Sequence, residues 1–158
     1  MYFKPAFAFA LCVAAPVFAQ HQKHGADDES RAVLATIDRM FDALATKDPA
    51  AMAAVTIAEG RATAATIGED GKEKLHFSTW GAFEQHLAGI PGAPVEKLID
   101  PHVHVEGPIA MVWSPYVFTL DGKLSHCGIN HVDLVKQDGA WRVLNITWTQ
   151  RKTGCPEL

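Results

Sequence analysis

Apolar and polar residues alternate along the last third of the chain, residues 101–155, in four runs that short turns separate. The turns contain Gly107, Gly122 and Gly139, and the last two of these glycines follow an aspartate. An Asp-Gly pair between alternating runs predicts a β-hairpin, because glycine accepts the positive φ that such a turn requires. This part of the chain is therefore predicted to form four antiparallel strands joined as a meander.

The first half of the chain shows helical spacing instead. Apolar residues recur every three or four positions from Asp28 to Thr46 and predict a helix with one apolar face. Asp48 is suited to cap a second helix over residues 49–55, in which Pro49 takes the first position. A hairpin follows, with strands over residues 61–67 and 72–77. A third helix over residues 80–87, capped by Ser78 or Thr79, completes the order.

The chain opens with a pattern typical of an export signal. Lys4 provides a short basic start, residues 5–16 are almost wholly apolar, and Ala19 is a small residue at a suitable cleavage site. A membrane anchor is the alternative, but the apolar run is shorter than the roughly 20 residues that a spanning helix needs. We therefore expect a signal peptide over residues 1–19, a periplasmic or secreted protein, and no stable membrane anchor after cleavage.

Cleavage would leave 158 − 19 = 139 residues, which is the size of one ordinary domain. Residues 20–28 are polar and lack apolar periodicity, so they are predicted to form a flexible leader before a single domain over residues 29–155. The formal net charge of −4 becomes −5 when Lys4 is lost. This mild acidity, without clustered Lys and Arg, argues against nucleic-acid binding. The sequence also contains no fingerprint of a bound cofactor.

Two cysteines, Cys127 and Cys155, would remain in the exported chain. An oxidising compartment allows them to form a disulfide. The Asp138-Gly139 turn places Cys127 opposite Gln150, so the chain would have to fold back after that strand to bring Cys155 close. The alternative is a buried free Cys127 and a loose terminal Cys155.

The order of elements resembles that of the nuclear transport factor 2-like superfamily. The residues most similar to that superfamily are Lys47-Asp48 with the alanine-rich stretch 50–54, and the stretch 131–143, which looks like the closing hairpin of the SnoaL-like branch. Residues 125–128 and 151–156 are similar to members described as lumazine-binding proteins. The resemblance implies an α+β fold in which a strongly curved, mostly antiparallel sheet wraps around about three helices and leaves a pocket. It does not imply one function, since the superfamily includes cyclases, isomerases, dehydratases and noncatalytic association domains.

The predicted hairpins assign the side chains of the meander to two faces of the sheet. The Asp121-Gly122 turn places Tyr116 opposite Cys127, which puts His131 and Asp133 on the same face as Tyr116. We expect this face to line the pocket, with ligand-binding residues Ser114, Tyr116 and Trp148. The other face would carry His102, His104, Met111, Trp113, His126 and Asn130, and we expect it to form a homodimer interface with Trp113 near its centre.

His131 and Asp133 are the candidate catalytic residues, because a carboxylate beside an imidazole can move a proton near pH 7. The structural alternative is that Asp133 pairs with Arg142 and that His131 is an ordinary core residue. Tyr116 and Trp148 have the similar alternative of core packing.

Three histidines, His102, His104 and His126, could together bind zinc, but the sequence offers no carboxylate or cysteine pair beside them, so we expect no metal site. Three functions remain open: an exported protein that binds a small apolar or aromatic molecule, an acid–base enzyme of the cyclase, isomerase or dehydratase kind using His131 and Asp133, and a noncatalytic dimerisation module. Only the first two require a cavity.

Overall fold

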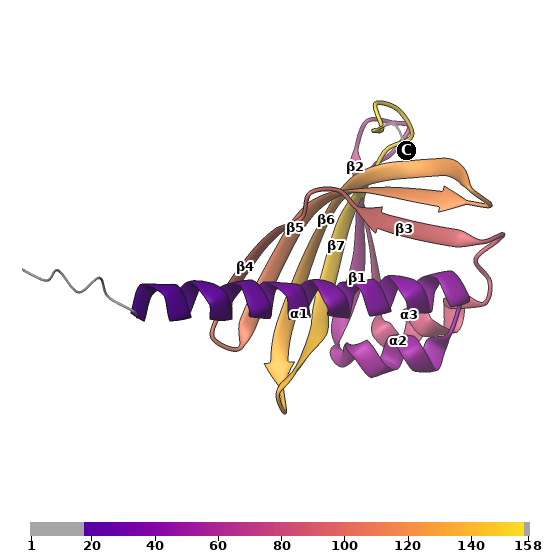
Figure 1. Ribbon diagram of the computed structural model, residues 1–158. Coiled ribbons are helices and arrows are strands. Elements are labelled where there is room, and N and C mark those ends of the chain that lie inside the picture. The colour runs from indigo at the N-terminus through magenta and orange to yellow at the C-terminus, as the bar shows by residue number, and fades with distance from the viewer. Residues whose placement is uncertain (1–17, 157–158) are drawn as a thin grey trace, which may run out of the picture.

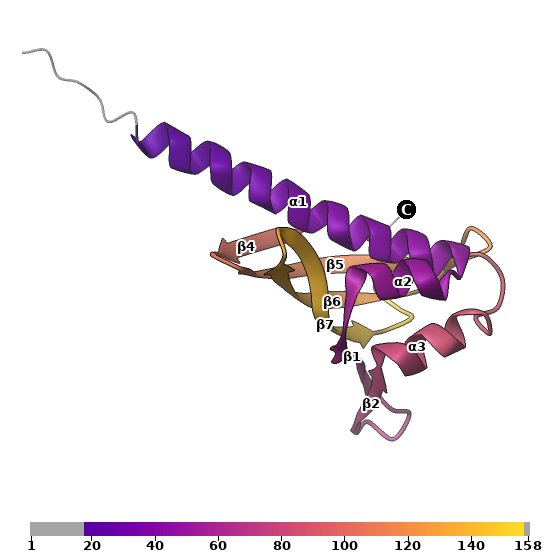
Figure 2. The same cartoon turned by 90° about the horizontal axis from the view of Figure 1, so that it is seen from below.

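The computed structural model describes residues 18–156 of the chain. Over these residues the chain forms three helices and a seven-stranded sheet, and all three helices lie on one side of it (Figures 1 and 2). The sheet is strongly curved and does not close on itself. This is the α+β architecture that the sequence predicted. The predicted signal peptide lies almost wholly outside the described residues.

Helix α1, Phe18–Thr46, packs its apolar stripe onto the concave side of the sheet, where Val33 and Ile37 are fully buried. The helix begins at Phe18 and not near Asp28, so the predicted start is wrong. Residues 20–28 contain no proline, and the single Gly25 costs a helix only about 1 kcal/mol. The first turns of α1 extend past the edge of the sheet (Figure 1).

Helix α2, Pro49–Val55, and helix α3, Trp80–Leu87, have the predicted bounds. The Asp48 side chain accepts hydrogen bonds from the backbone N–H groups of Ala50 and Ala51, and Thr79 accepts one from Ala82. The predicted caps are therefore confirmed. Satisfying the free N–H groups of the first turn is what allows such short helices to start where they do.

The sheet has the strand order β2-β1-β7-β6-β5-β3, and β4 also pairs with β5. The parallel pair β1–β7 joins the hairpin to the meander, and the other pairs are antiparallel. The hairpin and the four-stranded meander were predicted. Strand β3 was not predicted. The strands are β1 Thr56–Ile67, β2 Glu73–Thr79, β3 Pro94–Leu98, β4 His102–Glu106, β5 Ile109–Leu120, β6 Lys123–Gln137 and β7 Ala140–Gln150.

Two β-bulges shift the register of the meander. Ser125 is an extra residue in β6, so Tyr116 faces Gly128 and not Cys127 as expected. Leu144 is an extra residue in β7. A one-residue slip moves every following side chain to the opposite face of the sheet. The face assigned to β6 from sequence is therefore wrong, while that of β5 is correct.

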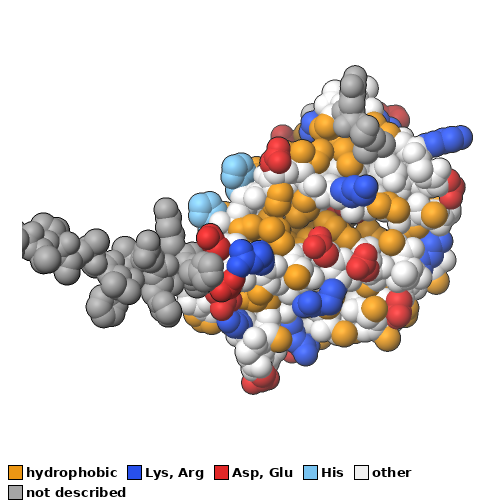
Figure 3. Space-filling view, viewed as in Figure 1, with side chains coloured by type: hydrophobic (Ala, Val, Ile, Leu, Met, Phe, Trp, Pro, Cys, Tyr) orange, Lys and Arg blue, Asp and Glu red, His pale blue; other side chains and the backbone are white. Residues whose placement is uncertain are grey.

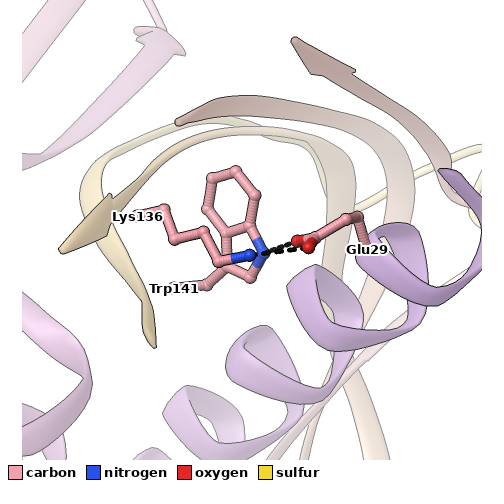
Figure 4. A network of polar contacts seen from close by, with 3 residues as sticks. All are labelled: Glu29, Lys136 and Trp141. Carbon is pink, nitrogen blue, oxygen red and sulfur yellow. Dashed lines mark hydrogen bonds and ion pairs between the residues drawn. The ribbon is translucent and has the colours of Figure 1, made fainter. Parts of the chain in front are cut away.

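A polar network ties α1 to the closing hairpin of the sheet (Figure 4). The Glu29 carboxylate accepts hydrogen bonds from Lys136 Nζ at 2.6 Å and from Trp141 Nε1 at 2.7 Å. These two charge-assisted bonds lower the pKa of Glu29 below its usual value of 4.5. They fix the helix against the hairpin that joins β6 and β7.

Candidate functional site

A cavity of about 240 Å³ lies between the helices and the concave side of the sheet. Most of its wall is apolar, and aromatic rings from helices and strands alike contribute to it: Phe41, Trp80, Phe83, Tyr116, Phe118 and Trp148. Its polar side chains are Glu96, His126, Asn130 and Gln150. A mostly apolar hollow with a few placed polar groups is the usual form of a small-molecule site. Hydrophobic side chains also gather on the surface above α1 (Figure 3).

The aromatic wall is held by hydrogen bonds to backbone carbonyls. Trp80 Nε1 donates to the Leu144 carbonyl oxygen at 2.8 Å, and the Tyr116 hydroxyl donates to the Thr149 carbonyl oxygen at 2.9 Å. The Tyr116 ring fits here because its partner on β6, Gly128, has no side chain. A Cβ at that position would lie 2.9 Å from the Tyr116 ring and would overlap the Thr149 carbonyl.

Glu96 is the acidic group of the cavity. Its carboxyl oxygen Oε1 accepts a hydrogen bond from Asn130 Nδ2 at 2.6 Å. Burial raises its pKa to about 7, and the bond from Asn130 offsets only part of that rise. The residue keeps a partly exposed surface because it faces the cavity. Near neutral pH the protonated and ionised forms are therefore both present.

His126 lies beside Glu96 in the register. Phe118 pairs with Glu96 on one side and with His126 on the other, so the three residues form a row across β3, β5 and β6. The His126 ring stacks on Phe118, with 4.6 Å between ring centroids. Burial, together with the nearby Lys152 charge, lowers the pKa of His126, so the imidazole is favoured in its neutral form. Burial and the Glu96 charge raise the pKa of Tyr116 well above its usual value.

The structure separates the residues that the sequence grouped into one site. Tyr116 and Trp148 line the cavity as expected. Ser114 is buried next to it, but its hydroxyl accepts a hydrogen bond from Ile99 N at 3.2 Å and donates to Ile99 O at 3.0 Å, which leaves it engaged with the backbone.

His131 and Asp133 form the expected pair, with 3.3 Å between Nε2 and Oδ1, but the pair lies on the convex face outside this cavity. Asp133 contacts Asn145 there, and His131 packs against Trp113. The prediction that they share a face with Tyr116 is wrong because of the bulge at Ser125. The same bulge turns His126 and Asn130 inward.

Sequence reasoning missed Glu96 because it missed β3. The strand has five residues, begins with a proline and directs a glutamate inward, so it lacks the apolar alternation that predicts strands. The run Val95–Ile99 between Gly92 and Pro101 was the available signal. Alternation there would have placed Glu96 with Leu98 on one face.

The three histidines that could have bound zinc do not converge. His102 and His104 are exposed on the edge strand β4, whereas His126 faces the cavity. Among the described residues, no three His, Cys, Asp or Glu side chains are arranged to hold a metal ion. None of the described helices has the length and apolar content needed to cross a membrane.

A disulfide joins Cys127 and Cys155, whose Cα atoms are 5.6 Å apart. Cys127 pairs with Arg151 through two backbone hydrogen bonds, where Gln150 was expected, and the chain then turns through Gly154 to bring Cys155 back. The bond fastens the C-terminal segment beside β6, close to the Tyr116 end of the cavity.

No protein-family model and no curated protein matches this sequence. Solved structures match its fold. One is a function-unknown protein from Mycobacterium tuberculosis, with a TM-score of 0.63 at 21% identity over 80% of this chain and 78% of that one. Another is an NTF2-like protein of unknown function from Shewanella baltica, with a TM-score of 0.59 at 13% identity over 80% of this chain and 96% of that one.

A third match is the beta subunit of a proposed aromatic-ring-hydroxylating dioxygenase from Novosphingobium aromaticivorans, with a TM-score of 0.67 at 11% identity over 81% of this chain and 92% of that one. At such identities the likeness shows the fold alone. The chain has the nuclear transport factor 2-like (NTF2-like) fold, as the resemblance predicted. Within this fold, the cavity between the helices and the sheet has the form of a small-molecule site.

Proposed function

We propose that this protein is exported and binds a small apolar or aromatic molecule in the cavity between its helices and its sheet. The observation that carries the proposal is the cavity itself, with six aromatic rings in its wall and four polar side chains. Its volume of about 240 Å³ is slightly below the about 300–1,000 Å³ typical of drug-sized ligand sites, which favours a ligand of one or two rings. A dimerisation module with a filled core would not need this space.

Ligand capture tests this proposal. Native mass spectrometry of protein purified from the periplasm of its own cells should show a retained small molecule. Trp148→Ala, which removes one wall of the cavity, should lower affinity for the captured molecule or for a fluorescent aromatic probe by tenfold or more.

Trp113→Ala is the matched control, because Trp113 lies on the same sheet but is half exposed on the convex face. Equal losses of affinity in both variants, or no binding of any aromatic probe by the wild type, would contradict the proposal.

Acid–base catalysis is the second candidate, and Glu96 is the residue that supports it. A carboxyl group with a pKa of about 7 inside an apolar cavity is suited to give or accept a proton at neutral pH. If the protein exchanges a proton on a carbonyl compound, Glu96→Gln should lower the exchange rate by about 10²-fold or more while binding persists. Equal rates in wild type and variant would remove this candidate.

A further inference from the structure

Two residues that line the cavity, Glu96 and Asn130, carry acceptor atoms that no described residue satisfies. Asn130 is 1% exposed, and its amide nitrogen is used by Glu96. Its amide oxygen Oδ1 is buried and accepts no hydrogen bond within the described part of the chain. The Glu96 carboxyl group accepts no bond there other than the one from Asn130. A buried polar atom without a partner costs about 1–3 kcal/mol, so its retention points to a partner that is absent here.

The two side chains converge because of their places in the sheet. Glu96 lies in the row that contains His126, and Asn130 lies four residues further along β6 on the same face. Between these two β6 positions is Gly128, which presents no side chain to the cavity. The long Glu96 side chain can therefore reach the Asn130 amide.

Of the donors that line the cavity, two already have backbone partners, and neither His126 nor Gln150 makes a hydrogen bond to Glu96 or to Asn130 Oδ1. The Tyr116 hydroxyl donates to Thr149, and Trp80 Nε1 donates to Leu144. His126 Nδ1 lies 3.2 Å from the Ser125 hydroxyl. No Lys or Arg of the described chain lines the cavity, so Glu96 has no cationic partner inside it. A group that fits must bring hydrogen-bond donors, and a positive charge would match the ionised carboxylate.

We infer that the ligand of this cavity is an aromatic or apolar amine, bound as its ammonium ion between Glu96 and the Asn130 Oδ1 atom. This inference rests on the proposed binding function and specifies its ligand class. The ammonium group donates one hydrogen to each acceptor, and its apolar body occupies the ring-lined remainder of the cavity. Aromatic faces add a cation–π attraction, which is stronger where water is excluded.

The proton balance of this binding step follows from Glu96. The empty cavity holds Glu96 partly protonated at neutral pH, since its pKa is about 7. An ammonium ion selects the ionised form, so binding releases a proton from Glu96. The other groups that act on this site are Tyr116, neutral in this range because its pKa is raised, and His126, whose pKa is lowered. Arg151 and Lys152 act from outside the cavity.

The test compares amines with neutral alcohols of the same shape: benzylamine with benzyl alcohol, and phenethylamine with phenethyl alcohol. Isothermal titration calorimetry is run at pH 6 and pH 8 on the full exported chain. We expect the better amine to bind at least tenfold more tightly than its alcohol at pH 8, as a hydrogen bond between charged groups is worth about 1.5–3 kcal/mol.

The affinity of that amine should fall by about tenfold at pH 6, where Glu96 is mostly protonated, while the affinity of the alcohol stays constant. Titrations of the wild type in buffers of different ionisation enthalpy should give different binding heats with the amine, which reveals proton release, and equal binding heats with the alcohol. Glu96→Gln should abolish both the preference and the pH dependence. Glu106→Gln, the same change at an exposed position of β4, should retain them.

Equal binding of amines and alcohols, without proton release, would overturn the amine inference while leaving the pocket function intact. Absence of binding by every probe would overturn both. The proton measurement needs only the wild type, so it decides the inference even if Glu96→Gln fails to fold.

Discussion

Replacing Glu96 by glutamine should stabilise the protein, and increasingly so as the pH rises. Folding raises the pKa of Glu96 from 4.5 to about 7. Between pH 4.5 and pH 7 the folded protein therefore binds more protons at this residue than the unfolded protein does. The contribution of Glu96 to stability is therefore full below pH 4.5 and is lost as the pH rises through 7. Glutamine is neutral throughout and avoids this loss.

The size of the effect follows from linkage. The pKa of Glu96 differs between 4.5 in the unfolded and about 7 in the folded state. At 1.36 kcal/mol for each pKa unit, this difference lowers the free energy of unfolding of the wild type by about 3 kcal/mol at pH 8 and by under about 1 kcal/mol at pH 5. Because Glu96 keeps some exposed surface, solvent reduces these figures, and we expect about 1–3 kcal/mol at pH 8. This is a large fraction of the stability of a domain of this size.

Urea unfolding followed by tryptophan fluorescence at pH 5 and pH 8 measures the effect. At an m-value of about 2 kcal/mol/M, a gain of 2 kcal/mol moves the midpoint of the variant up by about 1 M relative to wild type at pH 8. His126, with its lowered pKa, favours the opposite pH trend, but it is common to both proteins and cancels in the difference. A difference between variant and wild type that stays constant from pH 5 to pH 8 would refute the reasoning.

Three further predictions concern other parts of the chain. Cys155→Ser should lower the free energy of unfolding by about 3–4 kcal/mol, from the loop entropy of a disulfide spanning 28 residues, and wild type in reductant should show the same loss in urea unfolding. Glu29→Gln should lower the melting temperature above pH 4.5, where the depressed pKa of Glu29 stabilises the fold, and the loss should shrink as the pH falls through that lowered pKa; a loss independent of pH would contradict the role of the charge. Residues 20–158, the chain expected after signal cleavage, should sediment as a homodimer at micromolar concentration, and Trp113→Asp, at a half-exposed position of the convex face, should yield monomer; a wild-type monomer would exclude this interface.

Local signals in the sequence were sufficient for most of the elements. Asp48 with Pro49 marks the start of α2, Thr79 that of α3, and the glycine turns define the meander, because each signal acts through atoms within a few residues of it. Strand β3 carried only a weak signal, the short run Val95–Ile99. It is held in place by pairing with β5, a contact between segments that no short pattern reveals.

The candidate site was harder to predict than the fold. The sequence placed Tyr116 and Trp148 in the cavity correctly. Tyr116 lies on β5, which has no bulge, and for Trp148 the bulge in β7 cancels the one-residue slip in β6, so its side chain returns to the predicted face. His131 and Asp133 were misplaced by one bulge, at a serine that carries no glycine or proline signal. A bulge needs only one residue near the helical region of φ and ψ, which a serine readily adopts.

The bulge at Ser125 decides which chemistry faces the cavity. Without the extra residue, Phe118 would pair with Ser125 and the inward positions of β6 would be Ile129, His131 and Asp133. Glu96 would then lose Asn130, its one hydrogen-bond donor among the described residues, and Asp133 would turn from the convex face to the concave one. Burying the Asp133 carboxylate where Leu134 now packs would cost free energy at neutral pH, so such a register would be less stable. The acceptor pair that we assign to an amine therefore depends on a backbone irregularity that brings Asn130 inward and keeps Asp133 on the outside.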